Sequence, residues 1–290
     1  MQDAVLRMLE RYSLKSANEA IRALREIVQE CALLGLWRAK FFEHAAFYGG
    51  TALRILYGME RFSEDLDFTL LKPDPAFSLA RYGDSLLEEL QALGFDVHMN
   101  IRRKVAASSV ESAFLKANTR THLIQVGIPA GMTSQIPANQ IIRINFEIDR
   151  DPPPLFTTES RYVLLPVPFA VKVCALPDLF AGKMHALLFR RWRNRVKGRD
   201  WYDFVWFVSY YPSLHVAHLE ERMRQTGQWS HQEHLTGDRL KSLLYQVIAQ
   251  IDIGKAQEEV RPFLRDPSVV DIWSRDFFRA LVERITFTLY

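Results

Sequence analysis

The chain has 290 residues, 48% of them hydrophobic and 24% charged, so it can bury a real core in one large or two modest domains. This composition excludes a disordered chain, and no apolar run is long enough to cross a membrane. Cys31 and Cys174 lie far apart in apolar segments, which predicts reduced thiols in a cytoplasmic protein and no zinc site. The net charge of +3 is too small to indicate a nucleic-acid partner by itself.

The N-terminal segment is predicted to be helical scaffold. Residues 3–12 and 16–36 show apolar side chains at helical period, and Ser16 with Glu19 fits a capping box. No residue type in this segment suggests chemistry.

The stretch from Phe47 to Leu71 is predicted to be a strand ending at Tyr48, a Gly49-Gly50 turn, a helix opening at Thr51 and a second strand. A glycine turn that opens a helix can hold a phosphate, because backbone N–H groups and the helix dipole point at the anion. The sequence therefore predicts a phosphate site at this turn.

The middle of the chain alternates between short helices and strands. The cleanest alternation is residues 141–149, where Ile142, Ile144, Phe146 and Ile148 share one face. Residues 110–128 fit either a strand pair or a short helix. We also expect a helix at 78–93, strands at 95–101, 162–165 and 169–173, and a loop at 129–137.

From Pro177 onward the pattern becomes almost entirely helical. This change predicts a domain at 1–176 and a helical domain at 177–290, packed together because no flexible linker joins them. The expected helices are 178–192, 200–210, 215–226, 237–251 and 270–289.

Asp65 and Asp67 are the strongest candidates for metal ligands. Leu66 and Phe68 take the core face of the predicted strand, so the two carboxylates share the opposite face at a Cα separation of about 6–7 Å. Two solvated acids on a half-exposed strand are the ordinary alternative. The preceding phosphate turn favours a metal that bridges carboxylates and phosphate oxygens, as nucleotidyl transfer requires.

Glu147 is the best candidate for a third carboxylate, because the 141–149 strand could present it to the same metal. Asp149 shares its face and is the second choice. An outward polar edge explains the same pattern about equally well.

Lys183 and the acids of the 200–210 helix form the other candidate group. Lys183 is the one cation within the apolar helix 179–189, so it either extends to solvent or points its charge at a phosphate. Asp200 and Asp203 are neighbours at i, i+3 and are ordinary in a first helical turn. Lys183 is a plausible ion-pair partner for them.

The segment 190–199 carries the one strong basic cluster. A solvated loop and an RNA-backbone contact explain such a charge run about equally well beside a nucleotide site. The cations expected to contact RNA are Arg190, Arg191, Arg193, Arg195 and Lys197.

These motifs, in this order, resemble the AbiEii/AbiGii-type nucleotidyltransferase toxins, to which the MenT toxins are similar. The resemblance spans roughly residues 47–205. It is carried by Gly49-Gly50-Thr51-Ala52-Leu53, Arg61-Phe62-Ser63-Glu64-Asp65-Leu66-Asp67-Phe68, Lys183, and Arg199-Asp200-x-Tyr202-Asp203.

The resemblance implies an α+β fold with a polymerase-β-like nucleotidyltransferase core, a mixed sheet and a helical C-terminal domain. It implies use of an NTP with Mg²⁺ or Mn²⁺, transfer to tRNA as in characterised relatives, and a DNA-binding antitoxin encoded nearby. By position it makes Gly49 and Gly50 the phosphate turn, and Asp65 and Asp67 the metal ligands. Lys183 becomes the triphosphate contact, and Asp200 or Asp203 completes the site.

One departure from the family pattern affects the phosphate turn. The usual fingerprint has Gly-Ser, whereas this chain has Gly-Gly-Thr, so Thr51 is expected to supply the hydroxyl one residue later.

We therefore expect a nucleotidyltransferase that moves an NMP to RNA, with the tRNA 3′ end as the acceptor. Nucleotidylation of a protein or small molecule, a non-catalytic nucleotide- or RNA-binding protein, and a metal nuclease remain alternatives, because the same acids suit each of them.

Overall fold

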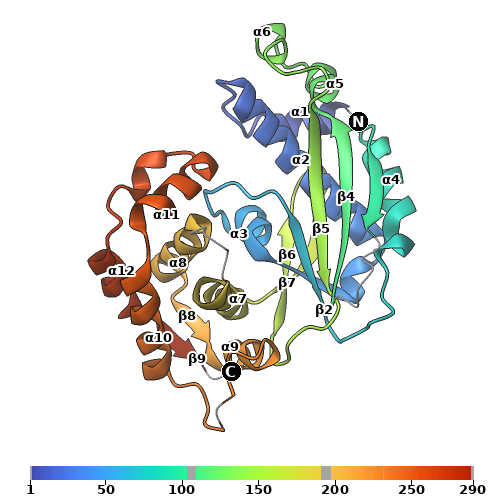
Figure 1. Cartoon of the computed structure of the whole chain (residues 1–290). Coiled ribbons are helices and arrows are strands. Elements are labelled where there is room, and N and C mark those ends of the chain that lie inside the picture. Colours follow the sequence, from blue (N-terminus) through green and yellow to red (C-terminus); the bar gives the residue numbers. More distant parts are fainter. Residues whose placement is uncertain (1, 103–108, 191–196, 231, 289–290) are drawn as a thin grey trace. The chain divides into compact units, whose positions relative to one another are not determined.

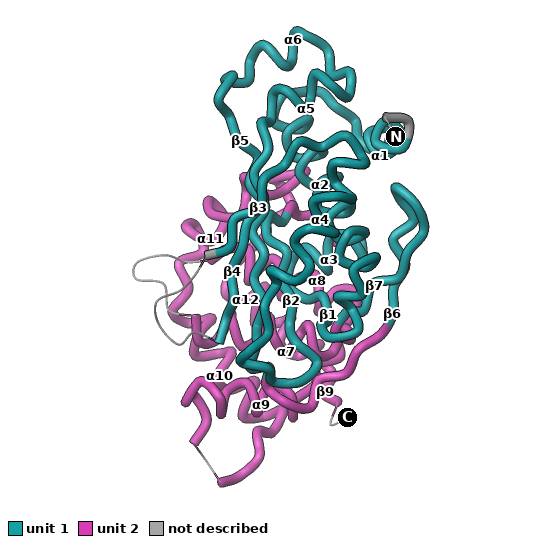
Figure 2. Tube along the Cα trace, turned by 90° about the vertical axis from the view of Figure 1, so that its right-hand side faces the viewer, with its two compact units in different colours: residues 1–58, 63–152, 160–173 teal, residues 59–62, 153–159, 174–290 magenta. Residues whose placement is uncertain are grey.

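The computed structural model describes residues 2–102, 109–190, 197–230 and 232–288 (Figure 1). The chain forms two compact units, coloured separately in Figure 2. Unit 1 comprises residues 1–58, 63–152 and 160–173, and unit 2 comprises residues 59–62, 153–159 and 174–290. The longest segment of unit 2 begins at Cys174, close to the composition change at Pro177. Unit 2 also includes the short segments 59–62 and 153–159, which lie within the predicted domain 1–176.

Unit 1 is built on a mixed sheet that has seven strands in the described residues, in the order β3-β4-β5-β2-β1-β7-β6. The pairs β2–β5 and β1–β7 are parallel, whereas β1–β2, β3–β4 and β4–β5 are antiparallel. The strands are β1 (Ala45–Tyr48), β2 (Leu66–Leu70), β3 (His98–Arg102), β4 (Val110–Asn118), β5 (Ile141–Asp149), β6 (Thr158–Val163) and β7 (Phe169–Cys174).

The register of the central strands is fixed by aromatic packing on one face. Phe47 stacks on Phe68 with ring centroids 5.2 Å apart, and Phe68 stacks on Phe146 at 6.4 Å. All three side chains are fully buried. Side chains alternate between the two faces of a strand, so a register shift of one residue would expose these three rings. The polar residues that alternate with them therefore lie on the opposite face of the sheet.

The helices of unit 1 cover the apolar face. Helix α2 packs against β5 and against α4, and Figure 2 shows these two helices on the same side of β4 and β5. Ser16 caps α2 by accepting a hydrogen bond from the Glu19 N–H, as predicted. The helical segments are α1 (Gln2–Leu9), α2 (Ala17–Arg38), η1 (Phe41–Glu43), α3 (Gly49–Tyr57), η2 (Leu79–Tyr82), α4 (Gly83–Ala92), α5 (Thr119–Gln125) and α6 (Ala130–Thr133).

Unit 2 is a helical assembly with a small parallel strand pair, β8–β9. Its core includes Phe180 stacked on Phe207 at 4.6 Å. Its elements are α7 (Leu176–Phe189), α8 (Gly198–Tyr210), β8 (Ser213–His215), α9 (Val216–Gln225), α10 (Gly237–Gln250), α11 (Ile253–Val260), η3 (Arg261–Phe263), η4 (Pro267–Val270), α12 (Arg275–Val282) and β9 (Thr286–Thr288).

Buried polar contacts explain why the segment 153–159 belongs to unit 2. Asp178 accepts hydrogen bonds from the N–H and the hydroxyl of Thr157, at 2.8 and 2.9 Å. The other oxygen of Asp178 lies 2.5 Å from Nδ1 of His215. A buried carboxylate requires such partners, so Thr157 is tied to α7 and β8.

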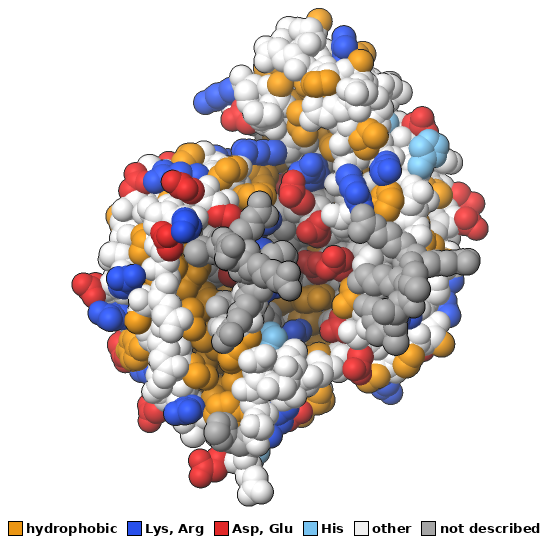
Figure 3. All heavy atoms as spheres, in the orientation of Figure 1, with side chains coloured by type: hydrophobic (Ala, Val, Ile, Leu, Met, Phe, Trp, Pro, Cys, Tyr) orange, Lys and Arg blue, Asp and Glu red, His pale blue; other side chains and the backbone are white. Residues whose placement is uncertain are grey.

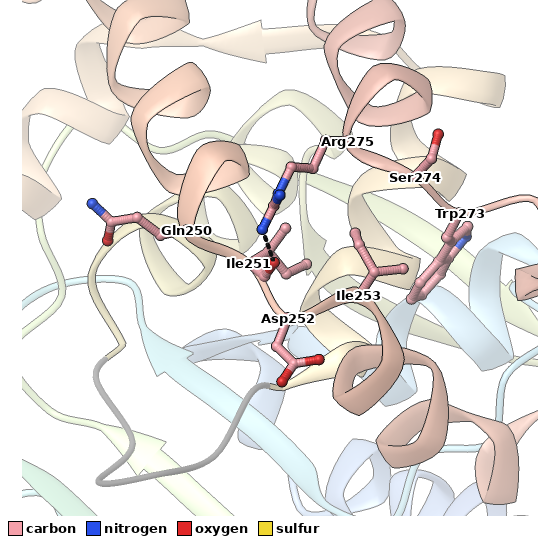
Figure 4. Close-up of a pocket in the computed structure, with 7 residues that line it drawn as sticks. All are labelled: Gln250, Ile251, Asp252, Ile253, Trp273, Ser274 and Arg275. Atoms are coloured by element: carbon pink, nitrogen blue, oxygen red, sulfur yellow. Dashed lines mark hydrogen bonds between the residues drawn. The ribbon is translucent and has the colours of Figure 1, made fainter.

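An open groove of about 650 Å³ lies between α10, α11 and α12. Ile251, Ile253 and Trp273 line it together with polar side chains, and Arg275 donates to the carbonyl of Ile251 (Figure 4). Within the described ranges, no helix is long and apolar enough to cross a membrane.

Most of the predicted elements are confirmed, and the 141–149 strand is found with its predicted ends. Residues 110–128 are β4 followed by α5, and the expected loop at 129–137 contains α6. The expected helix at 270–289 is wrong, because η4, α12 and β9 occupy that region. Helix α11 and the strands β8 and β9 were not expected.

Candidate active site

Asp65 and Asp67 lie at the start of β2, next to its two neighbouring strands. Asp67 is in register with Tyr48 on β1 and with Glu147 on β5. The buried Leu66 and Phe68 point the other way, so Asp67 and Glu147 share the polar face. The sheet thus brings together the carboxylates that the sequence singled out.

Gly49 holds the backbone directly against the Asp67 carboxylate. It is the first residue of α3 and has a φ of 84°, which favours glycine. A Cβ atom at this position would overlap the side chain of Asp67. Gly49 is therefore required both for the turn and for the close approach of the helix start to a carboxylate. The first turn of α3, which includes Gly50, therefore starts beside Asp67. The N–H groups of a first helical turn have no partner within the helix.

Thr51 has a positioning role in this structure. Its side chain is fully buried, and its hydroxyl donates a hydrogen bond to the backbone carbonyl of Asp65. The hydroxyl proton that a phosphate would need is therefore committed to the strand that carries the two aspartates. The direct phosphate contact expected of Thr51 stays a prediction.

Asn145 and Arg143 complete the polar face on β5. Asn145 Nδ2 donates to Asp65 Oδ1 at 2.7 Å, and Arg143 Nε donates to Asn145 Oδ1 at 2.9 Å. The Arg143 guanidinium carbon lies 4.0 Å from the ring centroid of Phe114 on β4. A chain of contacts therefore runs from Phe114 through Arg143 and Asn145 to Asp65.

The two candidates for a third carboxylate differ in their surroundings. Glu147 is exposed beside Asp67, whereas Asp149 accepts a hydrogen bond from the N–H of Asp151 at 3.1 Å. The register places Glu147 closer to Asp67, but its role as a base stays a prediction.

The donor set suits a hard divalent cation. Among the residues that the structure describes, no group of three or more His, Cys, Asp or Glu side chains is arranged around one metal position. Mg²⁺ is commonly bound by one or two carboxylates, with phosphate oxygens and water completing its six ligands. Asp65 and Asp67 therefore fit a metal that arrives with a nucleotide, and they do not form a closed protein site.

In unit 2, Asp203 is enclosed by two cations. Arg61 binds both of its oxygens, with Nε–Oδ1 at 2.5 Å and Nη2–Oδ2 at 2.7 Å, and Lys183 Nζ lies 2.7 Å from Oδ2. Asp203 is fully buried, whereas the Lys183 side chain is 17% exposed. The ion pair expected for Lys183 is thus formed with Asp203, and the roles of both residues at a nucleotide stay predictions.

The charge state of this group follows from its geometry. Burial alone would raise the pKa of Asp203, but the charges of Arg61 and Lys183 and their hydrogen bonds hold that pKa below its usual value. The group of three thus carries a net charge of about +1 at neutral pH. Lys183 is its more exposed cation.

Asp200 and Lys197 lie close to the same group. Burial lowers the pKa of Lys197; the charge of Asp200 opposes this shift, and the positive charges of Arg190, Arg199 and Lys183 add to it. Arg199 is engaged with Glu259 at 3.2 Å. Arg191, Arg193 and Arg195 lie outside the described residues.

Sequence reasoning gave no role to two residues that hold the candidate site together. Arg61 begins the motif that ends at Phe68, and its position four residues before Asp65 is the one signal that the sequence offers. Asn145 was assigned only to the polar face of its strand. Its hydrogen bond to Asp65 depends on the pairing of β2 with β5, which the sequence does not reveal.

Comparison with known proteins identifies the family. The family described as nucleotidyl transferase AbiEii toxin of type IV toxin–antitoxin systems matches residues 31–281. The structure of JHP933 from Helicobacter pylori matches with a TM-score of 0.50 and 18% identity, over 90% of this chain and 88% of that one. A candidate nucleotidyltransferase from Helicobacter pylori has a TM-score of 0.48 and 18% identity, over 89% of each chain. The comparison with curated proteins gave no match.

The likeness to JHP933 is one of fold alone, whereas the family match covers most of the chain, including both aspartates, Lys183 and Asp203. The chain therefore belongs to the AbiEii nucleotidyl transferase toxin family and is a nucleotidyltransferase.

Proposed function

We propose that this nucleotidyltransferase moves an NMP from an NTP to a hydroxyl group of RNA, with the 3′ end of a tRNA as the acceptor. The observation that carries the proposal is the placement of Asp67 against Gly49, at the start of α3. There, a carboxylate suited to a metal and backbone N–H groups suited to phosphate adjoin each other.

Each residue of the site has one task in this proposal. Asp65 and Asp67 hold Mg²⁺ or Mn²⁺, which, when bound, neutralises phosphate charge and favours loss of the acceptor proton. The first turn of α3 at Gly49 and Gly50 holds phosphate oxygens. Lys183 adds a positive charge to the triphosphate.

The transfer itself exchanges one P–O bond for another. The acceptor oxygen bonds to the α-phosphorus, and the bond from that phosphorus to the bridging oxygen of the β-phosphate breaks. Pyrophosphate leaves with the electron pair of that bond. Glu147, exposed beside Asp67, accepts the hydroxyl proton.

The basic segment 190–199 is proposed to assist RNA binding through Arg190 and Lys197. Membership of a toxin–antitoxin family further implies an antitoxin, which we propose is a DNA-binding protein encoded nearby. Neither proposal is needed for the transfer reaction.

The direct test uses purified protein, total tRNA, Mg²⁺ and each α-³²P-labelled NTP in turn. We expect label in the RNA with one or more nucleotides, and loss of that label to background in Asp67→Asn. Asp96→Asn is the control, because Asp96 is an exposed acid of the same unit. Thermal unfolding of both variants should match that of the wild type. Full transfer by Asp67→Asn would contradict the mechanism.

The same reaction mixture separates the alternatives. Digestion with RNase or with protease shows whether the label is on RNA or on protein. Shortened RNA without label would indicate a nuclease. Nucleotide binding without transfer to any cellular RNA or protein would indicate a non-catalytic binding protein.

A further inference from the structure

Beside the two aspartates, the open face of β4 and β5 carries a group of cationic and aromatic side chains. Phe114 is in register with Asn145, and Lys116 is in register with Arg143, so all four share the face of Asp67. The Arg143 guanidinium carbon and the Lys116 Nζ lie over the ring of Phe114, 4.0 and 4.9 Å from its centroid. Figure 3 shows basic and acidic side chains gathered together over these strands.

Neither cation of this group has a carboxylate partner among the residues that the structure describes. Arg143 donates through Nε to the neutral Asn145, and no ion pair involves Arg143 or Lys116. By contrast, Arg54 in the same unit pairs with Glu26 at 2.8 Å. Two half-buried cations without counter-ions form a site that favours an external anion.

The position of this group relative to Asp67 distinguishes it from the phosphate turn. The strand order β4-β5-β2-β1 puts Arg143 and Lys116 on one side of β2 and Gly49, which directly follows β1, on the other. In phosphoryl transfer the attacking and leaving oxygens lie roughly in line on opposite sides of the phosphorus. If pyrophosphate leaves toward α3, the acceptor approaches from β5 and β4.

We propose that Arg143 and Lys116 bind the phosphodiester backbone of the single-stranded acceptor end of RNA, upstream of its reacting hydroxyl. The proposal rests on the proposed function and adds a surface to it. Arg143 lies four residues from Glu147 along β5, about 13 Å at the usual rise of a strand. The contact is therefore made upstream of the terminal nucleotide.

Phe114 and Asn145 are positioning residues in this proposal. The ring of Phe114 supports one face of the Arg143 guanidinium, and Asn145 fixes its Nε, so the two terminal nitrogens remain for phosphate oxygens. Asn145 also donates to Asp65, so RNA binding at Arg143 and the placement of a metal carboxylate share one side chain.

The test measures RNA binding apart from catalysis. The Asp67→Asn chain is titrated into a fluorescent single-stranded RNA and followed by anisotropy at several salt concentrations. We expect Arg143→Ala and Lys116→Ala each to weaken binding about tenfold and to reduce the slope of log K against log salt by about 1. Lys72→Ala is the control, because Lys72 is an exposed cation of the same unit.

Steady-state kinetics with otherwise wild-type protein then assign the site. We expect Arg143→Ala to raise KM for RNA, with KM for the NTP unchanged, and Arg143→Lys to restore part of the RNA affinity. A raised KM for the NTP with unchanged RNA binding would assign the cations to the triphosphate and overturn the proposal. Unchanged RNA affinity in both alanine variants would also overturn it.

The two proposals fail in different ways. If no RNA is labelled by the wild type, the proposed function fails, whereas the anisotropy titration still decides whether Arg143 and Lys116 bind RNA. If label transfer is intact and KM for RNA is unchanged in both alanine variants, the acceptor surface fails and the proposed function stands.

Discussion

Two aspartates of this chain, Asp67 in unit 1 and Asp203 in unit 2, come from similar sequence contexts but have opposite surroundings. Asp67 lies on an open sheet face beside Glu147 and the glycine backbone of a helix start. Asp203 is fully buried, and Arg61 and Lys183 occupy both of its oxygens.

The difference shows that the neighbours of a carboxylate decide whether it can bind a ligand or whether it stabilises the fold. Among the described residues, the one side chain that hydrogen-bonds the Asp65 carboxylate is the neutral amide of Asn145, and no cation forms an ion pair with it. The negative charge of Asp203 is balanced by Arg61 and Lys183, and Asp203 orients the Lys183 side chain. The comparison predicts that substitutions at Asp203 act on stability, whereas substitutions around Asp67 act on transfer.

Asp203→Ala should have the largest effect on stability. It leaves Arg61, whose side chain is 4% exposed, without its buried partner. We expect the free energy of unfolding to fall by about 3–5 kcal/mol, measured by urea denaturation. Asp276→Ala is the control, because Asp276 forms an exposed pair with Arg279 and should cost about 1 kcal/mol or less.

The Asp203 contribution should also depend on pH. The pKa of Asp203 is held below its usual value in the folded state, so its stabilisation is complete above the unfolded-state pKa of about 3.9. The stabilisation is lost as the pH falls from there through the folded-state pKa. The stability difference between wild type and Asp203→Asn should therefore be constant near neutrality and narrow in acid. A gap that widened in acid would contradict this assignment.

Gly49→Ala should come next, with an effect on transfer. Its Cβ atom would displace the Asp67 carboxylate, and a misplacement of about 1 Å can cost about 100-fold in rate. The control is Gly58→Ala, because Gly58 also has a positive φ, of 74°, but has open space where a Cβ atom would lie. Both variants should lose about 1–2 kcal/mol of stability from backbone strain. Equal transfer by the two variants would show that the contact between Gly49 and Asp67 is unimportant.

Thr51→Val should have the smallest effect. It removes the hydrogen bond to the Asp65 carbonyl, which is worth about 1 kcal/mol, and we expect about a fivefold loss of transfer. Thr51→Ser keeps the hydroxyl and should restore most of the rate. If Thr51→Val and Thr51→Ser have the same transfer rate in single-turnover assays, the hydroxyl does not position Asp65.

The sequence predicted best the features that depend on local patterns. The predicted ends of the 141–149 strand are confirmed, because its strict alternation of apolar and polar residues fits a strand and not a helix. By contrast, 110–128 was ambiguous because β4 passes directly into α5 at Asn118, whose side chain caps that helix. The expected helix at 270–289 failed because β9 has three residues and is defined by pairing with β8, more than seventy positions away.

The candidate site was predictable in its residue types but not in their partners. Glycines and aspartates at close spacing indicated phosphate and metal. Which cation would pair with which acid depended on contacts across the fold, so Lys183 was expected beside either Asp200 or Asp203. Arg61 was given no role, because nothing in the composition shows that residues 59–62 belong to unit 2.

That placement of residues 59–62 affects how the protein can be synthesised. Arg61 leaves the ribosome 142 residues ahead of Asp203, so during translation a side chain destined for burial has no counter-ion. The contacts of unit 2 around Arg61 can close only after α8 has been synthesised, a late, long-range step of the kind that slows folding. A fragment ending at residue 176 would therefore leave Arg61 permanently without Asp203.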